Sequence, residues 1–560
     1  MFILLFYLTV SKQLHLIKPG CLRAAVNPAL DEPYKGLPHH ECLRGMQNNI
    51  FKHFTTFRCS VGCEKHRSLV NMPQTPPTRS VASELPRHDP PDTSGLTRLE
   101  TQVRRDLDSI EASPRAWVPE RRDVFDNVIA DVVIVGAGLS GLSLAFGLKR
   151  QGIERVHLID AAPPGLEGPW LTTARMRTLR SPKTLSGPDL GIPSLTYRAW
   201  HEAVEGQESW ERLDKIDRQA WMAYLAWFRS IIGLSIENHT RLLSISQEKD
   251  HLRLHVERNG QGSSIACRKV VLATGLEGAG GLSVPPGVGA LSRARWTHSG
   301  ELIDPSILSG KRVGVIGGAA SSFDWAVTAL EAGAASVTLL ARSPTLPRTE
   351  ILDWSNFPGF LNHFADLDDQ TRYRFTRRMF AFKTPPTNEM YERAMAFPQC
   401  RLATGAEIRS MCMAGDDITV TTTAGEFVFD HLLLGTGYSV DLSRRPELAR
   451  HIDQIATWAD RFVPAVGEED ADLLAYPYLG STFELMEKTP GALPMLANIH
   501  VFNSAAVPSL GPICNGITGL KSGVPKLVSG ICRGLFMPEV EHFYRSLDSY
   551  DTTHFQPDRV

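Results

Sequence analysis

The sequence predicts an α/β fold with two Rossmann-like dinucleotide-binding domains, the first interrupted by the second, and with helical inserts. Two observations predict it. A short apolar strand, a turn of small residues and an apolar helix follow one another from residue 131, and the same order recurs from residue 312. A further apolar strand follows each helix, which is the order of a βαβ unit built on a parallel sheet.

The first unit carries the glycine spacing G-x-G-x-x-G directly after a strand over 132–135. Glycine lets the chain turn sharply, lets a pyrophosphate approach the backbone and lets the helix over 142–148 pack on the strand. The next strand, over 156–159, ends in Asp160, whose carboxylate suits the hydroxyls of a ribose. The dinucleotide-binding residues predicted from this turn are Gly136, Gly138, Leu139, Ser140 and Gly141.

The second unit has a strand over 312–316 and a helix over 323–330, but its turn departs from the glycine spacing. Ala319 takes the place of the second glycine and Ser322 the place of the third, and both are small. The following strand leads to Arg342, and an arginine suits a ribose that bears a 2′-phosphate. We therefore expect NADP here; the alternative is that Arg342 is a solvated strand end. The predicted binding residues of the turn are Gly317, Gly318, Ser321 and Ser322.

Two segments without strand patterns are predicted to be helical inserts, over 161–235 and 345–400. The first is rich in tryptophan and arginine, and Trp170 is expected to line the face of a flat heterocycle. The alternative is that its tryptophans are core residues. The second insert interleaves arginine and phenylalanine, and we expect a lid over the cofactors rather than a nucleic-acid site, because the chain has no overall positive charge.

Small residues follow three further strands, where the chain leaves the edge of a sheet close to a cofactor. The last of these strands, over 500–503, precedes a turn and an apolar helix over 520–535. The N-terminus of that helix would stabilise negative charge on a reduced flavin. The cofactor-binding residues predicted from these turns are Thr274, Gly275, Thr436, Gly437, Asn515 and Gly516.

The composition is that of an ordinary globular protein. The chain has 560 residues, a net charge of -2 and 42% hydrophobic residues, so no nucleic acid and no anionic membrane is expected as a partner. Residues 1–10 are apolar but too short to span a bilayer, so no integral membrane span is predicted. The composition leaves a homo-oligomer open.

Cysteine usage favours a reducing compartment, and we expect the cytoplasm. Five of the nine cysteines are scattered, and four lie in the first 63 residues. Cys59 and Cys63 have His53 and His66 nearby, but this spacing is loose for zinc and no metal is predicted.

The predicted domains follow from these units. Residues 1–120 are expected to be a disordered or poorly structured extension, with Met72 as the natural start. The first domain is expected over 121–295 and again over 436–560, and the second over 296–435. Such an arrangement brings two dinucleotides face to face. An acid for a bare ribose in the first and an arginine for a phosphate in the second indicate FAD and NADPH, with hydride passing between them.

The order of motifs over residues 128–535 resembles the class B flavin-dependent monooxygenases, which include flavin-containing and N-hydroxylating enzymes. Residues 317–324 are similar to G-G-G-Q-S-A-A-E of the N-hydroxylating members, and residues 434–438 to L-A-T-G-Y. His298 matches the histidine of the F-x-G-x-x-x-H-x-x-x-Y/W fingerprint, whereas Ser292, Ala294 and Leu302 occupy its Phe, Gly and aromatic positions. Residues 178–183 are similar to T-N-x-P-K, with Arg180 at the asparagine position.

This resemblance implies that NADPH reduces FAD and that one oxygen atom of dioxygen enters a small organic substrate at nitrogen, sulfur or a ketone carbon. The aromatic inserts favour an apolar or aromatic substrate, such as a secondary metabolite. The resemblance also implies three candidate catalytic residues, Arg180 and Lys183 near the flavin edge and His298 near NADP. For His298 the alternative is a structural histidine.

Three other functions were weighed. A dithiol reductase is disfavoured, because no close cysteine pair follows Cys63. A flavin oxidoreductase or oxidase without oxygen insertion stays open. So does a non-catalytic dinucleotide-binding redox sensor, because the second turn and the histidine fingerprint depart from the family patterns.

Overall fold

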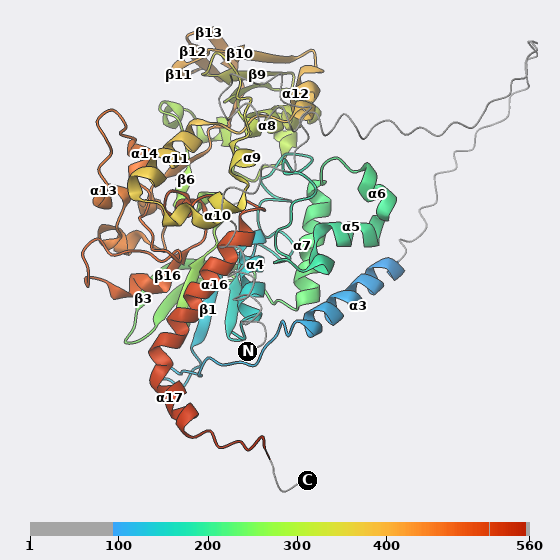
Figure 1. The fold of residues 1–560 in the computed structure, drawn as a ribbon. Coiled ribbons are helices and arrows are strands. Elements are labelled where there is room, and N and C mark those ends of the chain that lie inside the picture. The colour runs from blue at the N-terminus through green and yellow to red at the C-terminus, as the bar shows by residue number, and fades with distance from the viewer. Residues whose placement is uncertain (1–92, 515, 556–560) are drawn as a thin grey trace, which may run out of the picture. The chain divides into compact units, whose positions relative to one another are not determined.

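The computed structural model describes residues 93–514 and 516–555, which belong to one compact unit of the chain. Figure 1 shows the described helices and strands in chain order. Three sequence-based expectations fall outside the described residues. They concern Met72, the cysteine pair Cys59 and Cys63, and Asn515.

The first sheet has the strand order β2-β1-β5-β4-β3, with β16 pairing with β5 as well. The long strand β5 makes this possible, because its first half pairs with β4 and its second half with β16. The parallel members are β1 (Ala130–Val135), β2 (Val156–Ile159), β5 (Gln261–Leu272) and β16 (Ile499–Val501). Apolar and polar residues alternate in two runs over 241–256, as in a β-hairpin, and the structure forms one there from β3 (Thr240–Gln247) and β4 (Leu252–Arg258).

Three helices pack around the first turn of this sheet. Helix α4 (Leu139–Lys149) follows β1 and is buried along most of its length. Helix α16 (Leu520–Phe536) lies against it, and a Cβ at Gly147 would come within 2.9 Å of Val524, so the helices approach closely. Helix α7 (Arg218–Ile232) packs Phe228 edge-on against Phe146 at 5.7 Å between ring centroids. Figure 1 shows α4 between α16 and α7.

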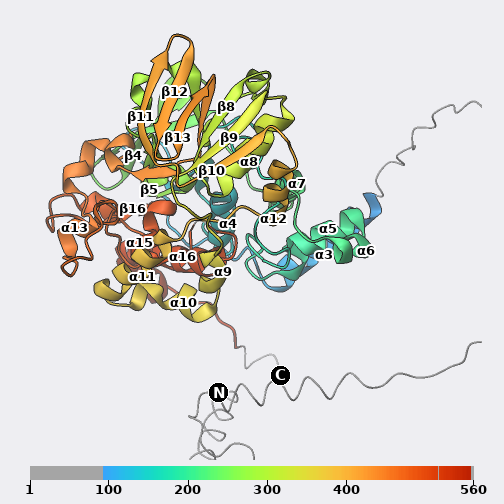
Figure 2. The same ribbon diagram turned by 90° about the horizontal axis from the view of Figure 1, so that it is seen from above.

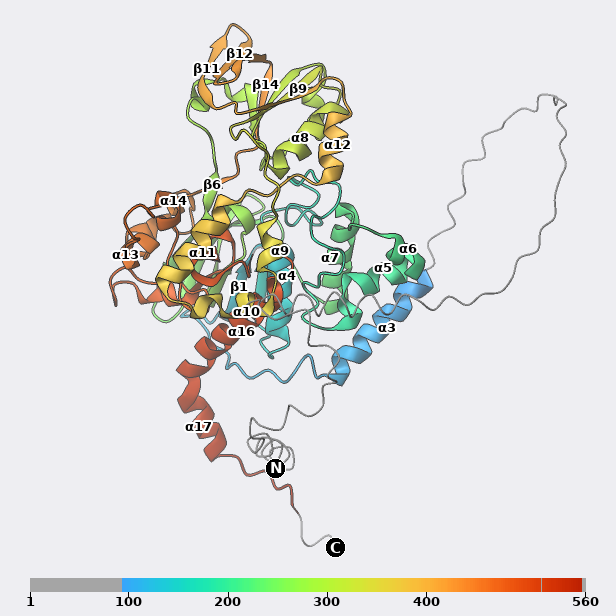
Figure 3. The ribbon, with the colours of Figure 1, turned by 45° about the horizontal axis from the view of Figure 1, so that its top comes forward.

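The second sheet is parallel, with the order β10-β9-β8-β14-β7. Its strands are β7 (Trp296–His298), β8 (Arg312–Ile316), β9 (Ser336–Ala341), β10 (Cys400–Thr404) and β14 (His431–Leu434). Two helices pack against one another beside it, α8 (Ala320–Glu331) and α12 (Asn388–Met395) (Figure 3). The α/β class with parallel Rossmann-like sheets is therefore confirmed.

The sequence over 427–434 indicates one continuous strand, but the structure interrupts it. The chain instead forms β13 (Gly425–Phe429) and β14, and Asp430 separates them. The Asp430 carboxylate accepts from both the backbone and the guanidinium of Arg312, which fixes the turn. Strand β13 belongs to an antiparallel meander with β11 (Ile408–Ala414) and β12 (Asp417–Thr422).

A short antiparallel pair, β6 (Gly280–Leu282) and β15 (Tyr438–Val440), joins the chain segments that run between the two sheets. The insert over 345–400 contains α9 (Ile351–Ser355), α10 (Pro358–His363) and α11 (Asp369–Ala381). Its helices pack on α15 (Val507–Leu510) and α16, where Arg372 Nη1 donates to the Ser509 carbonyl at 2.8 Å. Figure 2 shows α10 and α11 beside α15 and α16, so the insert is anchored on the C-terminal part of the first sheet.

The expectation of poor structure up to residue 120 is wrong for 93–109, which form helix α3 (Thr93–Ser109). This helix packs on α5 (Tyr197–Glu205), where Val103 is fully buried. Leu96, Leu99 and Leu107 pack against the same core. Apolar residues at helical spacing were the available signal. In the described part of the chain, no helix is both long and apolar enough to cross a membrane.

A buried carboxylate on β1 gives a pH-dependent prediction. Asp131 is 1% exposed, 3.1 Å from Arg155, and burial raises its pKa to about 6. The folded state therefore binds a proton more tightly than the unfolded chain, so the stability contributed by this group is lost as pH rises from about 4 to about 6. We expect the free energy of unfolding of the wild type, measured in urea, to fall between pH 4 and pH 7 by up to about 3 kcal/mol more than that of Asp131→Asn. An offset between the two proteins that is the same at both pH values would contradict this.

Candidate active site

The first turn is built so that no side chain fits between strand, turn and helix. Gly136 has φ +103°, and a Cβ there would lie 2.5 Å from the Ala273 carbonyl oxygen at the end of β5. A Cβ at Gly141 would lie 1.9 Å from the Gly136 carbonyl oxygen. The first and third glycines thus allow the sharp turn and the close packing of α4 on β1.

The second glycine faces another glycine rather than a side chain. A Cβ at Gly138 would lie 3.5 Å from Cα of Gly168, in ordinary contact. Gly138 is also the N-cap of α4 and makes no side-chain hydrogen bond there, so the first backbone N–H groups of α4 are open to an anion. This backbone cradle fits a pyrophosphate.

The C-terminal turn reaches the same place. Ser140, in the first turn of α4, donates to the Cys514 carbonyl at 3.1 Å. Gly516 follows shortly afterwards, and α16 begins after Gly519, again without a side-chain cap. The predicted residues Leu139, Ser140 and Gly516 are therefore brought together near two helix N-termini, which favour negative charge.

Asp160 is held in place by the turn itself. Its Oδ2 accepts from the Ala137 N–H at 2.7 Å and its Oδ1 from the Ala162 N–H at 2.8 Å. Burial raises the pKa of this carboxyl, and the two N–H groups oppose the rise. Each carboxylate oxygen keeps a second acceptor position, so Asp160 can still accept from ribose hydroxyls.

The ends of β5 and β16 are tied together by an asparagine that the sequence analysis did not single out. Asn503 Nδ2 donates to Thr274 Oγ1 at 3.0 Å and to the Leu272 carbonyl at 3.1 Å. A Cβ at Gly278 would lie 2.3 Å from the Asn503 amide carbon. Gly275, with φ +69°, follows Thr274 in open space. The signal available in the sequence was a polar residue at the end of a buried strand.

Trp170 supplies both stacking surface and a free donor. Its ring stands edge-on to Trp221 at 6.0 Å between centroids. Its indole Nε1 is buried and, among the described residues, has no acceptor. A buried N–H without a partner costs free energy unless a ligand oxygen or a water meets it. Trp170 is thus suited to line the binding site of a polar, flat ligand such as a flavin.

The second turn repeats the first with different side chains. Gly317 has φ +130°, and a Cβ there would lie 2.4 Å from Ser322 Oγ and 2.7 Å from the Gly435 carbonyl oxygen. Ser322 is fully buried in this contact. A Cβ at Gly318 would lie 2.7 Å from that of Ala341, so Gly318 allows β9 to approach. Ser321 is partly exposed on the first turn of α8.

The N-terminus of α8 and the end of β9 provide the groups expected for a phosphorylated nucleotide. Helix α8 has Ala319 as its N-cap without a side-chain hydrogen bond, and the Ala320 N–H donates to the Thr384 carbonyl at 3.0 Å. Arg342 directly follows β9, and its side chain is exposed. Within residues 93–514 and 516–555 its guanidinium has no hydrogen bond or ion pair, so it is free to bind a phosphate.

The next three predicted residues lie at or just after the ends of β7 and β14. Thr436 Oγ1 donates to the Ser283 carbonyl, and Gly437 has φ +78°. His298 is fully buried, its Nδ1 accepts from the Gly300 N–H at 3.0 Å, and its ring lies 6.1 Å from that of Tyr438. Burial lowers the pKa of His298, so the imidazole is neutral at pH 7. Nδ1 is thus taken up by the turn, whereas Nε2 is buried and has no partner among the described residues, so His298 stays a candidate for contact with the nicotinamide nucleotide.

Lys183 is occupied by a helix end. Its Nζ donates to the carbonyls of Trp210 and Leu213, each at 2.6 Å, at the C-terminus of α6 (Gln207–Arg212). The ammonium also lies 4.9 Å from the Trp210 ring centroid. Because these carbonyls take up its donors, Lys183 stabilises the end of α6 and is no longer a candidate for catalysis.

Arg180 reaches across to the second sheet. Its Nη2 lies 2.5 Å from Asp324 Oδ2, which belongs to α8. The two residues are 144 positions apart, so the sequence alone gave no sign of this pair. Arg180 thus joins the two dinucleotide-binding parts of the chain.

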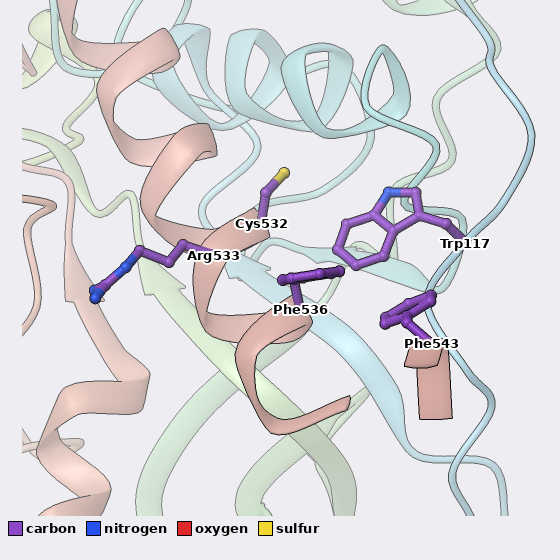
Figure 4. Close-up of a pocket in the computed structure, with 5 residues that line it drawn as sticks. All are labelled: Trp117, Cys532, Arg533, Phe536 and Phe543. Atoms are coloured by element: carbon purple, nitrogen blue, oxygen red, sulfur yellow. The ribbon is translucent and has the colours of Figure 1, made fainter. Parts of the chain in front are cut away.

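A separate pocket lies toward the other end of α16 (Figure 4). It is lined by Trp117, Cys532, Arg533, Phe536 and Phe543. Cys532 lies roughly 18 Å along the helix axis from Leu520, at 1.5 Å per residue. None of the predicted site residues lines this pocket, so it is not the cofactor site.

Comparison with known proteins also indicates binding of FAD and a nicotinamide nucleotide. A family model described as FAD-NAD(P)-binding matches residues 133–277, and one described as L-lysine 6-monooxygenase/L-ornithine 5-monooxygenase matches residues 209–439. An FAD-dependent urate hydroxylase of Xanthomonas campestris is 39% identical over 464 residues, which is 82% of this chain and 97% of that protein. The FAD-containing monooxygenase EthA of Mycolicibacterium smegmatis is 24% identical over 58% of this chain and 68% of its own length.

Solved structures share the fold at low identity. The ornithine hydroxylase PvdA from Pseudomonas aeruginosa has a TM-score of 0.57 at 15% identity and covers 73% of this chain and 100% of its own. The ornithine N-hydroxylase from Kutzneria sp. 744 has a TM-score of 0.56 at 17% identity, over 72% of this chain and 99% of its own.

The glycine cradle yields a direct test. In Gly138→Val the added side chain fills the space between Gly138 and Gly168, so we expect at least a roughly tenfold loss of FAD affinity. Retained flavin per protein, measured by absorbance, checks this, and circular dichroism reports on folding. The control is Gly262→Ala on β5, where a Cβ would meet nothing within 4 Å. A folded Gly138→Val protein that retains as much flavin as this control would refute the assignment.

Proposed function

The chain belongs to the class B flavin monooxygenase superfamily, and on this premise we propose that it hydroxylates urate or a closely related oxopurine, with NADPH as the electron donor. It is an FAD-dependent monooxygenase that uses NAD(P)H and dioxygen. The observation that carries the proposed substrate is the 39% identity to a urate hydroxylase over 97% of that protein's length. The 24% identity to EthA is lower and covers 68% of EthA.

The chemistry of the 170–180 segment supports an oxygen-rich, flat ligand. Trp170 Nε1, Arg175 Nε and Arg180 Nε are buried donors without an acceptor in the described part of the chain. Oxopurines and flavins both present ring carbonyl oxygens, and both are flat enough to stack on an indole or a guanidinium. These donors support an oxopurine over the other apolar or aromatic substrates that the sequence leaves open.

The reaction balances with the cofactors of the family. NADPH supplies two electrons, one atom of dioxygen enters the substrate and the other leaves as water, and FAD supplies the electron transfer and the activation of oxygen when bound. The residues of this chain bind the cofactors and orient them. The turn around Gly136 and Gly138, together with Asp160, would hold FAD, and the turn around Gly317 and Ser322 would hold the nicotinamide nucleotide.

The cytoplasm is the proposed location. All five described cysteines are free, although Cys267 and Cys514 are buried. Free thiols are typical of a reducing compartment.

The first prediction concerns coenzyme choice. Arg342→Ala removes the cation that we assign to the 2′-phosphate, so the KM for NADPH should rise roughly tenfold or more while that for NADH changes little. Steady-state oxidation of both coenzymes checks this. Arg409→Ala on β11 is the control, because Arg409 is an exposed arginine paired with Glu407. Equal effects of Arg342→Ala on both coenzymes would remove the argument for NADPH.

The second prediction concerns the substrate. Purified enzyme reduced by NADPH without oxygen, then mixed with air and urate, should consume urate and release an oxygenated product in step with NADPH oxidation. Mass spectrometry with ¹⁸O₂ identifies the inserted atom. Xanthine and L-ornithine serve as comparison substrates. Formation of oxygenated L-ornithine would contradict the proposed oxopurine substrate and indicate an amine instead. Hydrogen peroxide as the sole product with every substrate would favour an oxidase.

A further inference from the structure

Two arginines of the first dinucleotide-binding part extend onto the second. Arg180 pairs with Asp324 at 2.5 Å. Arg175 Nη2 donates to the Ile303 carbonyl at 3.0 Å, and its guanidinium lies 4.7 Å from the centroid of the Trp325 ring. A planar guanidinium over a tryptophan face is a favourable contact, and more so when it is partly buried.

The backbone of the segment that carries these arginines is hydrogen-bonded to residues 215–218 of the same dinucleotide-binding part. The Leu179 N–H donates to the Ile216 carbonyl at 2.8 Å, and the Arg218 N–H donates to the Arg177 carbonyl at 3.0 Å. Lys215 Nζ donates to the Arg180 carbonyl at 3.0 Å. The backbone is therefore fixed on its own side, and the two guanidinium groups are presented to the second sheet.

Their partners lie next to the second nucleotide turn. Asp324 and Trp325 follow Ser322 on α8, whose N-terminus forms that turn. The Asp324 side chain is 8% exposed and that of Trp325 is fully buried, with its indole Nε1 donating to the Ser299 carbonyl at 3.3 Å. Displacement of α8 would thus move the turn and break both contacts.

We propose that Arg180 and Asp324, supported by the contact of Arg175 with Trp325, form a latch that sets the distance between the two dinucleotide turns. Arg180 is then a positioning residue for hydride transfer. Removal of Arg180 leaves the buried Asp324 carboxylate without its partner, so the pair opposes separation of α8 from the segment that carries Arg180. A misplacement of about 1 Å between reacting groups can cost about a hundredfold in rate.

The test measures flavin reduction by NADPH without oxygen in Arg180→Ala and in the isosteric Asp324→Asn. The limiting rate should fall about ten- to hundredfold in both. The dissociation constant for NADP⁺ should stay within about threefold, because the latch acts on position rather than on binding. The double variant should be little worse than either single variant, because the two side chains act as one unit.

A matched control is available at Arg177, three residues before Arg180. Arg177 carries the same charge toward the same part of the chain, but its pair with Glu389 spans 4.0 Å and both side chains are about half exposed. Such a pair contributes little, so Arg177→Ala should leave the reduction rate within about twofold of wild type.

A second readout does not depend on activity. Small-angle X-ray scattering of the FAD-loaded protein without nucleotide should give a broader distance distribution for Asp324→Asn than for wild type or Arg177→Ala. Unchanged reduction rates and scattering in both latch variants would overturn the proposal. Loss of FAD from Arg180→Ala, with Asp324→Asn normal in every measurement, would overturn it as well, because Arg180 would then serve the flavin directly.

Discussion

Backbone passes so close to backbone at two turns that only small residues fit, and the rest of the fold depends on this contact. At Gly136 and Gly141 the neighbours of a missing Cβ are carbonyl oxygens, which cannot move aside without breaking the sheet or the helix. At Gly317 the neighbours are Ser322 and the Gly435 carbonyl. Each contact places a helix N-terminus at the end of a parallel strand, where it can meet a phosphate. The two sheets, their inserts and their connections are arranged around these two places.

The fold depends next on the contacts that connect the two dinucleotide-binding parts of the chain. The chain crosses between the sheets through segments that pair as β6 and β15, and the insert over 345–400 returns to the first part through Arg372 and α15. The contacts of Arg175 and Arg180 with α8 add a polar connection close to the second turn. These contacts restrain the two turns relative to one another, which hydride transfer between two bound cofactors requires.

The features that were predictable from sequence are local ones. Glycine spacing, flanking apolar strands and the acid or arginine after each unit lie within about thirty residues, the length of a βαβ unit, and their physical reasons are local too. What could not be predicted depends on distant partners. Nothing in the sequence near Arg180 indicated its ion pair with Asp324, which is 144 residues away. Lys183 was expected in catalysis, whereas it binds carbonyls of a helix whose end is visible only in three dimensions. Helix α3 was missed because a polar composition hid its apolar spacing.

The central claim is that the chain holds FAD at the first turn and a nicotinamide nucleotide at the second, close enough for direct hydride transfer. Stopped-flow reduction of the bound flavin under nitrogen, with NADPH deuterated at C4 of the nicotinamide ring, tests it most directly. The account predicts rapid bleaching of the yellow colour that is slowed severalfold by deuterium at one of the two C4 positions. A flavin that is not bleached, or is bleached at the same rate with deuterium at either position, would contradict it.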